Sequence, residues 1–356
     1  MQILEFIFGI AVLILLHEFG HFIAARLLKV KVDEFGIGLP PRLIGTAHNT
    51  NGKRRWFGVV PPEDINHDET ILSLNWIPLG GFVRPRGEND PSVPGGLAAA
   101  NPWVRLEVIF AGPLMNLLVG VVLGAILFYS MGERIPEKVL ISYIAPGSPA
   151  AEADLRLGDL FLEVNGQKID SIEKLQSLID QTLGQQVEIH FQRGESILTV
   201  TLVPRLNPPE GEGPMGVGLD NPTRPIGLLT ALDRGTKATY ETMRGILLLP
   251  VRLLKGQANP QEGRLVGYKG MYDIYQRIQN PLWFFMMISI SLGIMNLLPI
   301  PAVDGGRILL TLPEILVHRR VPAQYENMIH MVGLVALLIL LIYINLQDFI
   351  NPLRLP

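Results

Sequence analysis

Cysteine and charge are the two features that this sequence lacks. None of its 356 residues is Cys, which excludes disulfides, iron–sulfur clusters and thiolate-bound zinc, so any metal must be held by His, Asp or Glu. Thirty Lys and Arg against 33 Asp and Glu leave a net charge of −3. There is no general basic surface for nucleic acid, and we expect no nucleic-acid partner. Charged residues make up 18% of the chain and mean hydropathy is +0.30, which predicts long uncharged segments.

Four apolar segments reach or approach the length of about 17–25 residues that crosses a hydrocarbon core. They cover residues 6–28, 108–131, 281–303 and 328–346. The N-terminal segment lacks the basic start and the small-residue cleavage site of a signal peptide, so we expect it to be retained. The sequence therefore predicts a polytopic α-helical membrane protein with four transmembrane helices. The alternative is a large soluble protein with unusually apolar core helices.

The distribution of Lys and Arg predicts the orientation of these spans. No basic residue precedes the first span, ten lie from Arg26 to Arg105, and three lie between the third and fourth spans. Because basic residues concentrate in cytoplasmic loops, we expect loops 29–106 and 305–327 to be cytoplasmic. Both termini and the region from about 132 to 280 would then be extracytoplasmic.

The region after the second span contains a β-rich insert at residues 136–205. A helix is predicted near 171–180, among four short alternating strands at Val139–Ile144, Leu160–Val164, Val187–Gln192 and Ile197–Val203. The run from Pro146 to Gly166 resembles the PDZ signature, in which a short helix, a Gly-Asp turn, a strand and an Asn-Gly hairpin follow one another. PDZ domains bind an extended peptide as an added strand, so we expect a peptide tail as partner. The alternative is a domain that only filters access by size.

Residues 206–280 are predicted to contain a linker and an amphipathic helix. The stretch Asn207–Pro214 is rich in Pro and Gly, which is typical of a linker. From about Thr236 to Lys255 apolar residues recur at helical spacing with basic residues between them. Such a helix either lies at the membrane surface or packs against the soluble domain.

Three ionisable residues fall inside the first apolar segment, in His17-Glu18-Phe19-Gly20-His21. Histidines at positions i and i+4 share one helix face, so both imidazoles can reach one metal ion, and the intervening Glu18 is placed to act on a metal-bound water. Ionisable side chains are costly within a membrane and are therefore candidate functional residues. The alternative is a pair of polar residues bonded to neighbouring helices.

A catalytic zinc site usually has three protein ligands, and Asp304 is the candidate for the third. It follows Asn296-Leu-Leu-Pro-Ile-Pro-Ala-Val at the end of the third span. Pro299, Pro301, Gly305 and Gly306 are predicted to break the helix there. Broken backbone at membrane depth is tolerated inside protein or against a water-filled cavity, so the carboxylate can face the first span. The alternative is a surface loop with Asp304 in water.

These separated motifs, in this order, resemble the site-2 protease family of intramembrane zinc metalloproteases, and within it the bacterial regulators of sigma-E proteolysis. The resemblance covers most of the chain. It implies a protease core formed by residues 1–131 and 281–356, one zinc ion per chain on His17, His21 and Asp304, and Glu18 as the catalytic base. It also implies location in the bacterial inner membrane. The substrate would be a single-span membrane protein, such as an anti-sigma factor or a signal-peptide remnant.

The resemblance extends to residues expected to contact substrate. Asn296 would hold the substrate backbone, and Ala111-Gly-Pro-Leu-Met-Asn116 is similar to a family element near the active site. Residues 77–84 resemble a membrane-associated β-hairpin, in which Gly80 and Gly81 would pair with the unwound substrate. Arg307 stands where the family commonly has His.

Two other functions stay open. Buried His, Glu and Asp could relay protons or carry metal in a transport protein, although no inverted repeat is visible. The second is a catalytically inactive membrane scaffold that binds peptide tails through its PDZ domain, although such a scaffold would have no need of Glu18.

Overall fold

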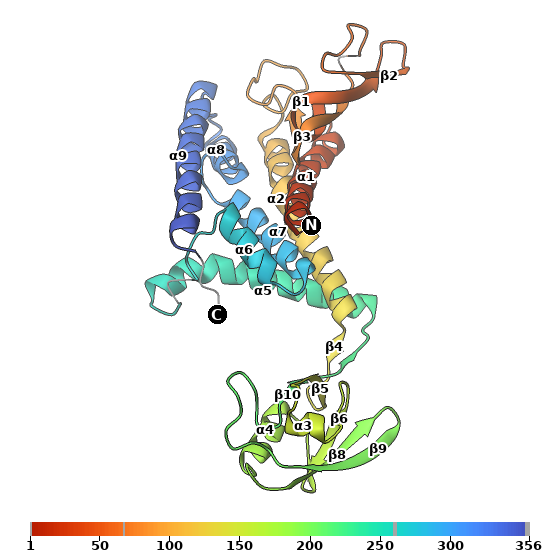
Figure 1. Ribbon diagram of the computed structural model, residues 1–356. Coiled ribbons are helices and arrows are strands. Elements are labelled where there is room, and N and C mark those ends of the chain that lie inside the picture. Colours follow the sequence, from red (N-terminus) through yellow and green to blue (C-terminus); the bar gives the residue numbers. More distant parts are fainter. Residues whose placement is uncertain (1, 67, 259–261, 353–356) are drawn as a thin grey trace. The chain divides into compact units, whose positions relative to one another are not determined.

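The structure is a computed structural model that describes residues 2–66, 68–258 and 262–352. Residues 259–261 of the predicted linker segment and 353–356 of the predicted second core half lie outside this description. The chain divides into two compact units, residues 1–127 with 229–356 and residues 128–228. Figure 1 shows the elements of both units.

Three helices are long and apolar enough to cross a membrane, by length and composition, in the part of the chain that the structure describes. They are α1 (Gln2–Leu27), α2 (Pro102–Met131) and α9 (Ala323–Ile350). They correspond to the first, second and fourth predicted spans. The helix in the third, α7 (Pro281–Leu297), has 17 residues, the lower limit of what crosses a bilayer. A fourth crossing stays a prediction.

The predicted third span was wrong at its C-terminal end. α7 stops at Leu297, residues 298–303 are not helical, and α8 (Asp304–Val317) begins at Asp304. Pro299 and Pro301 account for the break, because a proline cannot donate a hydrogen bond to the helix and disfavours helical backbone in the residue before it. Gly305 and Gly306 were expected to contribute to the break but lie inside the first turn of α8.

Two further helices belong to this unit, α5 (Leu228–Leu254) and α6 (Tyr268–Arg277). α5 packs on α2, where a Cβ on Gly235 would lie 2.6 Å from the backbone nitrogen of Ala125. Its apolar residues at the two ends, such as Leu229 and Leu254, are exposed. The amphipathic helix is thus longer than predicted, and one face of it packs against a membrane-type helix.

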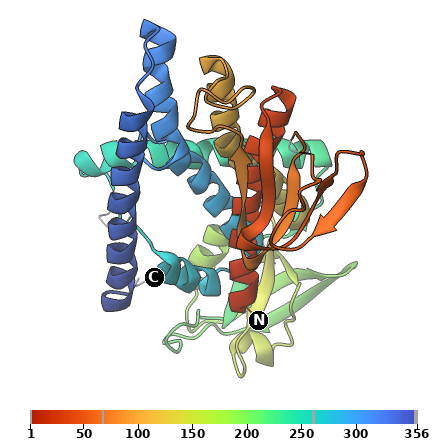
Figure 2. The same ribbon diagram turned by 90° about the horizontal axis from the view of Figure 1, so that it is seen from above.

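A three-stranded antiparallel sheet lies against α1, with strand order β2–β1–β3. Its strands are β1 (Val32–His48), β2 (Arg54–Phe57) and β3 (Ile71–Pro85). The predicted hairpin at 77–84 was wrong in its extent, because these residues lie within the single strand β3 and pair with β1, as Ile37 with Gly81. Figure 2 shows the sheet beside α1.

The second unit contains a sheet with strand order β10–β5–β6–β8–β9, and β7 also pairs with β6. Helices α3 (Pro149–Glu152) and α4 (Ile172–Asp180) accompany it. The strands are β5 (Val139–Ile144), β6 (Leu160–Val164), β7 (Gln167–Lys168), β8 (Val187–Arg193), β9 (Ser196–Leu202) and β10 (Val217–Asp220). The short strands β4 (Glu133–Arg134) and β11 (Thr223–Arg224) pair with each other.

The predicted strands and helix of this unit are confirmed to within one residue. Asn165 and Gly166 have positive φ values of 47° and 73°, as a tight hairpin turn requires. The predicted domain end at 205 was too early. β10, assigned to the linker from sequence, is an edge strand of the sheet, and Met215 just before it is buried in the same core.

Candidate metal centre

His17 and His21 lie on the buried face of α1, and each residue is 8% exposed. Their Nε2 atoms are 3.2 Å apart. Gly20 permits this burial, because a Cβ there would lie 2.5 Å from the carbonyl oxygen of Ala111 on α2. Close approach of two helices at a glycine thus places both imidazoles on the side of α1 that packs against α2, away from its exposed side.

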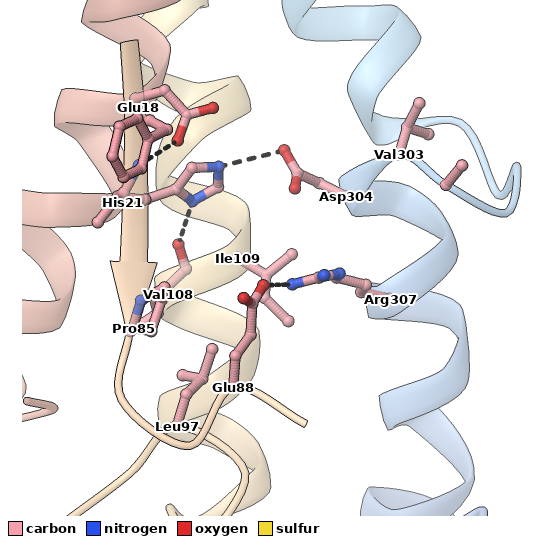
Figure 3. Close-up of a pocket in the computed structure, with 13 residues that line it drawn as sticks. Glu18, His21, Pro85, Glu88, Leu97, Val108, Ile109, Val303, Asp304 and Arg307 are labelled. Atoms are coloured by element: carbon pink, nitrogen blue, oxygen red, sulfur yellow. Dashed lines mark hydrogen bonds and ion pairs between the residues drawn. The ribbon is translucent and has the colours of Figure 1, made fainter. Parts of the chain in front are cut away.

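Asp304 is the first residue of α8, and its carboxylate faces both histidines. Its Oδ2 lies 3.1 Å from Nε2 of His17 and 3.3 Å from Nε2 of His21. Figure 3 shows the imidazole of His21 and this carboxylate pointing toward each other from different helices. The structure therefore brings together the three residues that the sequence predicted as metal ligands.

The donor set fits a zinc ion. Three ligand atoms, two imidazole nitrogens and one carboxylate oxygen, lie within 4.8 Å of one another. The separations of 3.1–3.3 Å match the roughly 3.3 Å between neighbouring ligands in a tetrahedron with metal–ligand distances of about 2.0 Å. Oδ2 of Asp304 is buried and makes no hydrogen bond of regular geometry with any residue that the structure describes. A cation between these three atoms would satisfy it.

Neighbouring groups hold the two imidazoles in orientations suited to metal binding. Nδ1 of His21 lies 2.8 Å from the carbonyl oxygen of Val108, an arrangement in which Nδ1 donates and Nε2 keeps its lone pair for a metal. Nδ1 of His17 lies 3.2 Å from the side-chain amide nitrogen, Nδ2, of Asn116. Oδ1 of Asn116 is buried and has no hydrogen-bond partner among the described residues. Turning the amide over would give Nδ1–H of His17 a carbonyl acceptor.

Glu18 lies beside the metal-donor set without belonging to it. Its Oε2 accepts a hydrogen bond of 3.2 Å from the backbone N–H of Val83 on β3. The side chain lines a cavity of about 260 Å³ together with His21 and Asp304. A carboxylate at this place can exchange a proton with a molecule in the cavity.

The far side of the same cavity is charged. Arg307, one turn after Asp304 on α8, forms an ion pair with Glu88 from the loop that follows β3. Figure 3 shows this pair beside the apolar side chains of Leu97 and Ile109. The sequence did not predict what Arg307 contacts, and the structure shows that its partner is Glu88.

Three of the residues predicted to bind substrate, Asn116, Gly80 and Gly81, pack against α1. Asn116 is 1% exposed and lies beneath His17. Gly80 and Gly81 pack on α1, where a Cβ would lie 2.5 Å from Cγ2 of Ile14 or 2.6 Å from Cδ1 of Leu15. Substrate binding by these three residues stays a prediction.

Asn296, the fourth predicted substrate-binding residue, lies in the last turn of α7 and is partly exposed. Among the described residues it is not one that lines the cavity. Its predicted role therefore also stays a prediction.

Several contributors to the site were not found from sequence. The carbonyl of Val108 and the N–H of Val83 are backbone groups, so no side-chain type marks them. Gly112 lies so close to His21 that a Cβ would be 2.3 Å from its Nε2. The short motif from Ala111 to Asn116 was the available signal for this part of α2.

A helix carrying two histidines and a glutamate, with a carboxylate ligand from a second helix, defines the class of metallopeptidases with a His-Glu-x-x-His motif. The profile of peptidase family M50 matches residues 5–56 and 46–340. The chain belongs to this family.

Three relatives match this chain over nearly all of their own length. A candidate zinc metalloprotease of Clostridium perfringens is 31% identical over 99% of this chain and 100% of its own length. Proteins with the same description from Campylobacter jejuni and Nostoc are each 30% identical over 98% of this chain, and over 93% and 96% of their own lengths. A PDZ domain of Listeria monocytogenes aligns with 23% of this chain and 87% of its own, at 23% identity and a TM-score of 0.21.

Proposed function

We propose that this protein is an intramembrane zinc metalloprotease, which hydrolyses a peptide bond within or near the transmembrane helix of a single-span membrane protein. One observation carries the proposal. The carboxylate of Glu18 lies beside a set of two imidazoles and one carboxylate, and three of these four groups come from α1, a helix long and apolar enough to cross a membrane.

His17, His21 and Asp304 would hold one zinc ion per chain, which when bound supplies a more acidic water and polarises a carbonyl oxygen. Glu18 would take a proton from the attacking water and return it to the leaving amine. The hydrogen bond from the N–H of Val83 keeps its carboxylate at the cavity. Apolar side chains around the cavity, including Leu97 and Ile109, would limit access of bulk water.

A helical substrate must unwind before it is cut, because its carbonyl groups are engaged in hydrogen bonds four residues apart. β3 is an edge strand of its sheet, and its residues Phe82 and Val83 line the cavity. We infer that the unwound segment adds to β3 as an extra strand, next to Gly80 and Gly81, while Asn296 holds its backbone.

The proposal includes a bacterial inner-membrane location with both termini and the β-rich unit extracytoplasmic, and loops 29–106 and 305–327 cytoplasmic. The β-rich unit is proposed to be a PDZ domain that receives a peptide tail or excludes untrimmed substrates. An edge strand, β10, supports peptide binding by strand addition. The exposed leucines of α5 are suited to contact with the lipid bilayer.

The proposal is tested by comparing wild type with Glu18→Gln in detergent on a panel of tagged single-span substrates, with products identified by mass spectrometry. Wild type alone should cut within the span, and the variant should lose about 10²–10⁴-fold in rate while retaining zinc. Equal cleavage by both proteins would show that Glu18 is not the base. Zinc in neither protein, with no cleavage of any substrate, would favour a scaffold. Metal uptake by vesicles without peptide cleavage would favour transport.

A further inference from the structure

The loop between α7 and α8 determines where Asp304 lies. It consists of residues 298–303, and Asp304 follows directly as the first residue of α8. Ala302, two residues before Asp304, has a φ of +78°, a conformation that residues with a Cβ rarely adopt. The surrounding structure must therefore hold this backbone in place.

On one side the loop is folded tightly onto the first turn of α8. A Cβ on Gly305 would lie 2.0 Å from the carbonyl oxygen of Leu298, and a Cβ on Gly306 would lie 2.4 Å from that of Ile300. With so little space, the loop and the start of α8 must move together.

On the other side the loop rests on α9, which lies beside α8 in both views (Figures 1 and 2). Nδ1 of His330 accepts a hydrogen bond of 3.2 Å from the N–H of Ala302. One turn further along α9, a Cβ on Gly333 would lie 2.3 Å from Cβ of Pro301. Gly333 is buried, whereas its neighbours Val332 and Leu334 are exposed, so this part of α9 packs on the loop through the glycine.

The imidazole of His330 is kept here at a cost. When Nδ1 accepts from Ala302, the proton is on Nε2, which is buried and has no hydrogen-bond partner among the described residues. An unpaired buried polar group is unfavourable. The contact with Ala302 is therefore the hydrogen bond that holds this ring among the described residues.

We propose that His330 is a positioning residue for the metal centre. It accepts the N–H of Ala302, fixes the left-handed backbone there, and so sets Asp304 against His17 and His21. It is not a metal ligand itself. The inference rests on the proposed function, because it assumes that these three residues bind zinc.

The test is zinc affinity, measured by chelator competition on the purified full chain in detergent. His330→Leu should bind zinc about 10–100-fold more weakly than wild type, as expected for loss of a group that orients a ligand. His330→Asn keeps an acceptor near the position of Nδ1 and should restore most of the affinity. Ala302→Gly in the His330→Leu background should also restore affinity, because glycine adopts positive φ without support.

Val332→Ala, at an exposed position of α9, is the matched control and should bind zinc as wild type does. Cobalt-substituted protein gives a second readout, because the visible spectrum of His330→Leu should change while that of Val332→Ala does not. If His330→Leu fails to fold, His330→Phe replaces it, because it keeps an aromatic ring at this position but has no acceptor for the N–H of Ala302.

Equal affinity of His330→Leu and wild type would overturn the inference. Equal losses in His330→Leu, His330→Asn and the double variant would overturn it as well, since the acceptor and the backbone strain would then be irrelevant. A wild type that binds no zinc would instead contradict the proposed function, so the two failures can be told apart.

Discussion

His17 and His21 are chemically identical, but the groups that orient them differ. A backbone carbonyl on α2 orients His21, whereas the side chain of Asn116 orients His17. A backbone acceptor cannot be removed by substitution, and a side chain can. Asn116 is therefore the residue through which the orientation of one imidazole can be tested.

At the residue scale we expect Asn116→Leu to weaken zinc binding by about 10–100-fold, because Nδ1–H of His17 loses its acceptor. Asn116→Asp keeps an oxygen at that place and should retain affinity. Chelator competition measures both. Leu118→Ala, at a half-exposed position two residues away, serves as the control. Equal affinities of wild type and Asn116→Leu would contradict the assigned contact.

Gly112 provides a second test at this scale. A Cβ there would lie 2.3 Å from Nε2 of His21, whereas a Cβ on Gly245 of α5 meets nothing within 4 Å. Gly112→Ala should displace the imidazole and reduce the zinc content of the purified protein, and Gly245→Ala should leave it unchanged. Full zinc occupancy in Gly112→Ala would show that His21 does not need its observed position.

At the scale of elements, the sheet and α1 act on the site together. β3 lies on α1 through Gly80 and Gly81, and two residues later the N–H of Val83 holds Glu18. The glycines have a packing role that the sequence did not reveal, since a Gly-Gly pair in a strand is equally compatible with close approach of a ligand.

We expect Gly81→Ala to lower the cleavage rate with little loss of zinc, because a Cβ would lie 2.6 Å from Cδ1 of Leu15 and move β3 away from Glu18. The rate of substrate cleavage and the zinc content are measured on the same sample. Gly58→Ala, where a Cβ meets nothing within 4 Å, is the control. Unchanged cleavage by Gly81→Ala would argue against the link between β3 and Glu18.

Much of the fold could be predicted from sequence, for identifiable reasons. Apolar length located the helices, and the spacing of His17 and His21 together with the prolines before Asp304 located the metal donors. Close packing between segments could not be predicted from sequence. The local sequence around Gly305 is the same whether this glycine ends a helix or, as observed, lies in the first turn of α8 against the carbonyl oxygen of Leu298. β10 was missed because only four residues pair, after a stretch rich in Pro and Gly.

At the scale of the whole molecule, the β-rich unit should be separable from the metal centre. It has its own buried core, and Arg134 pairs with Thr223 where the chain enters and leaves it. Replacing residues 136–221 with a short glycine-containing turn should leave zinc content intact. If the unit filters by size, the shortened protein should show a higher ratio of the cleavage rate of full-length substrate to that of trimmed substrate than the intact protein does. An unchanged ratio of the two rates would contradict the filter.

The central claim is that His17, His21 and Asp304 together bind a catalytic zinc ion. X-ray absorption at the zinc edge of the purified chain tests it most directly. The account predicts one zinc per chain, with two imidazole nitrogens and a carboxylate oxygen at about 2.0–2.2 Å, and loss of one oxygen ligand in Asp304→Ala. Absence of zinc, or a coordination shell that is the same in wild type and Asp304→Ala, would contradict it.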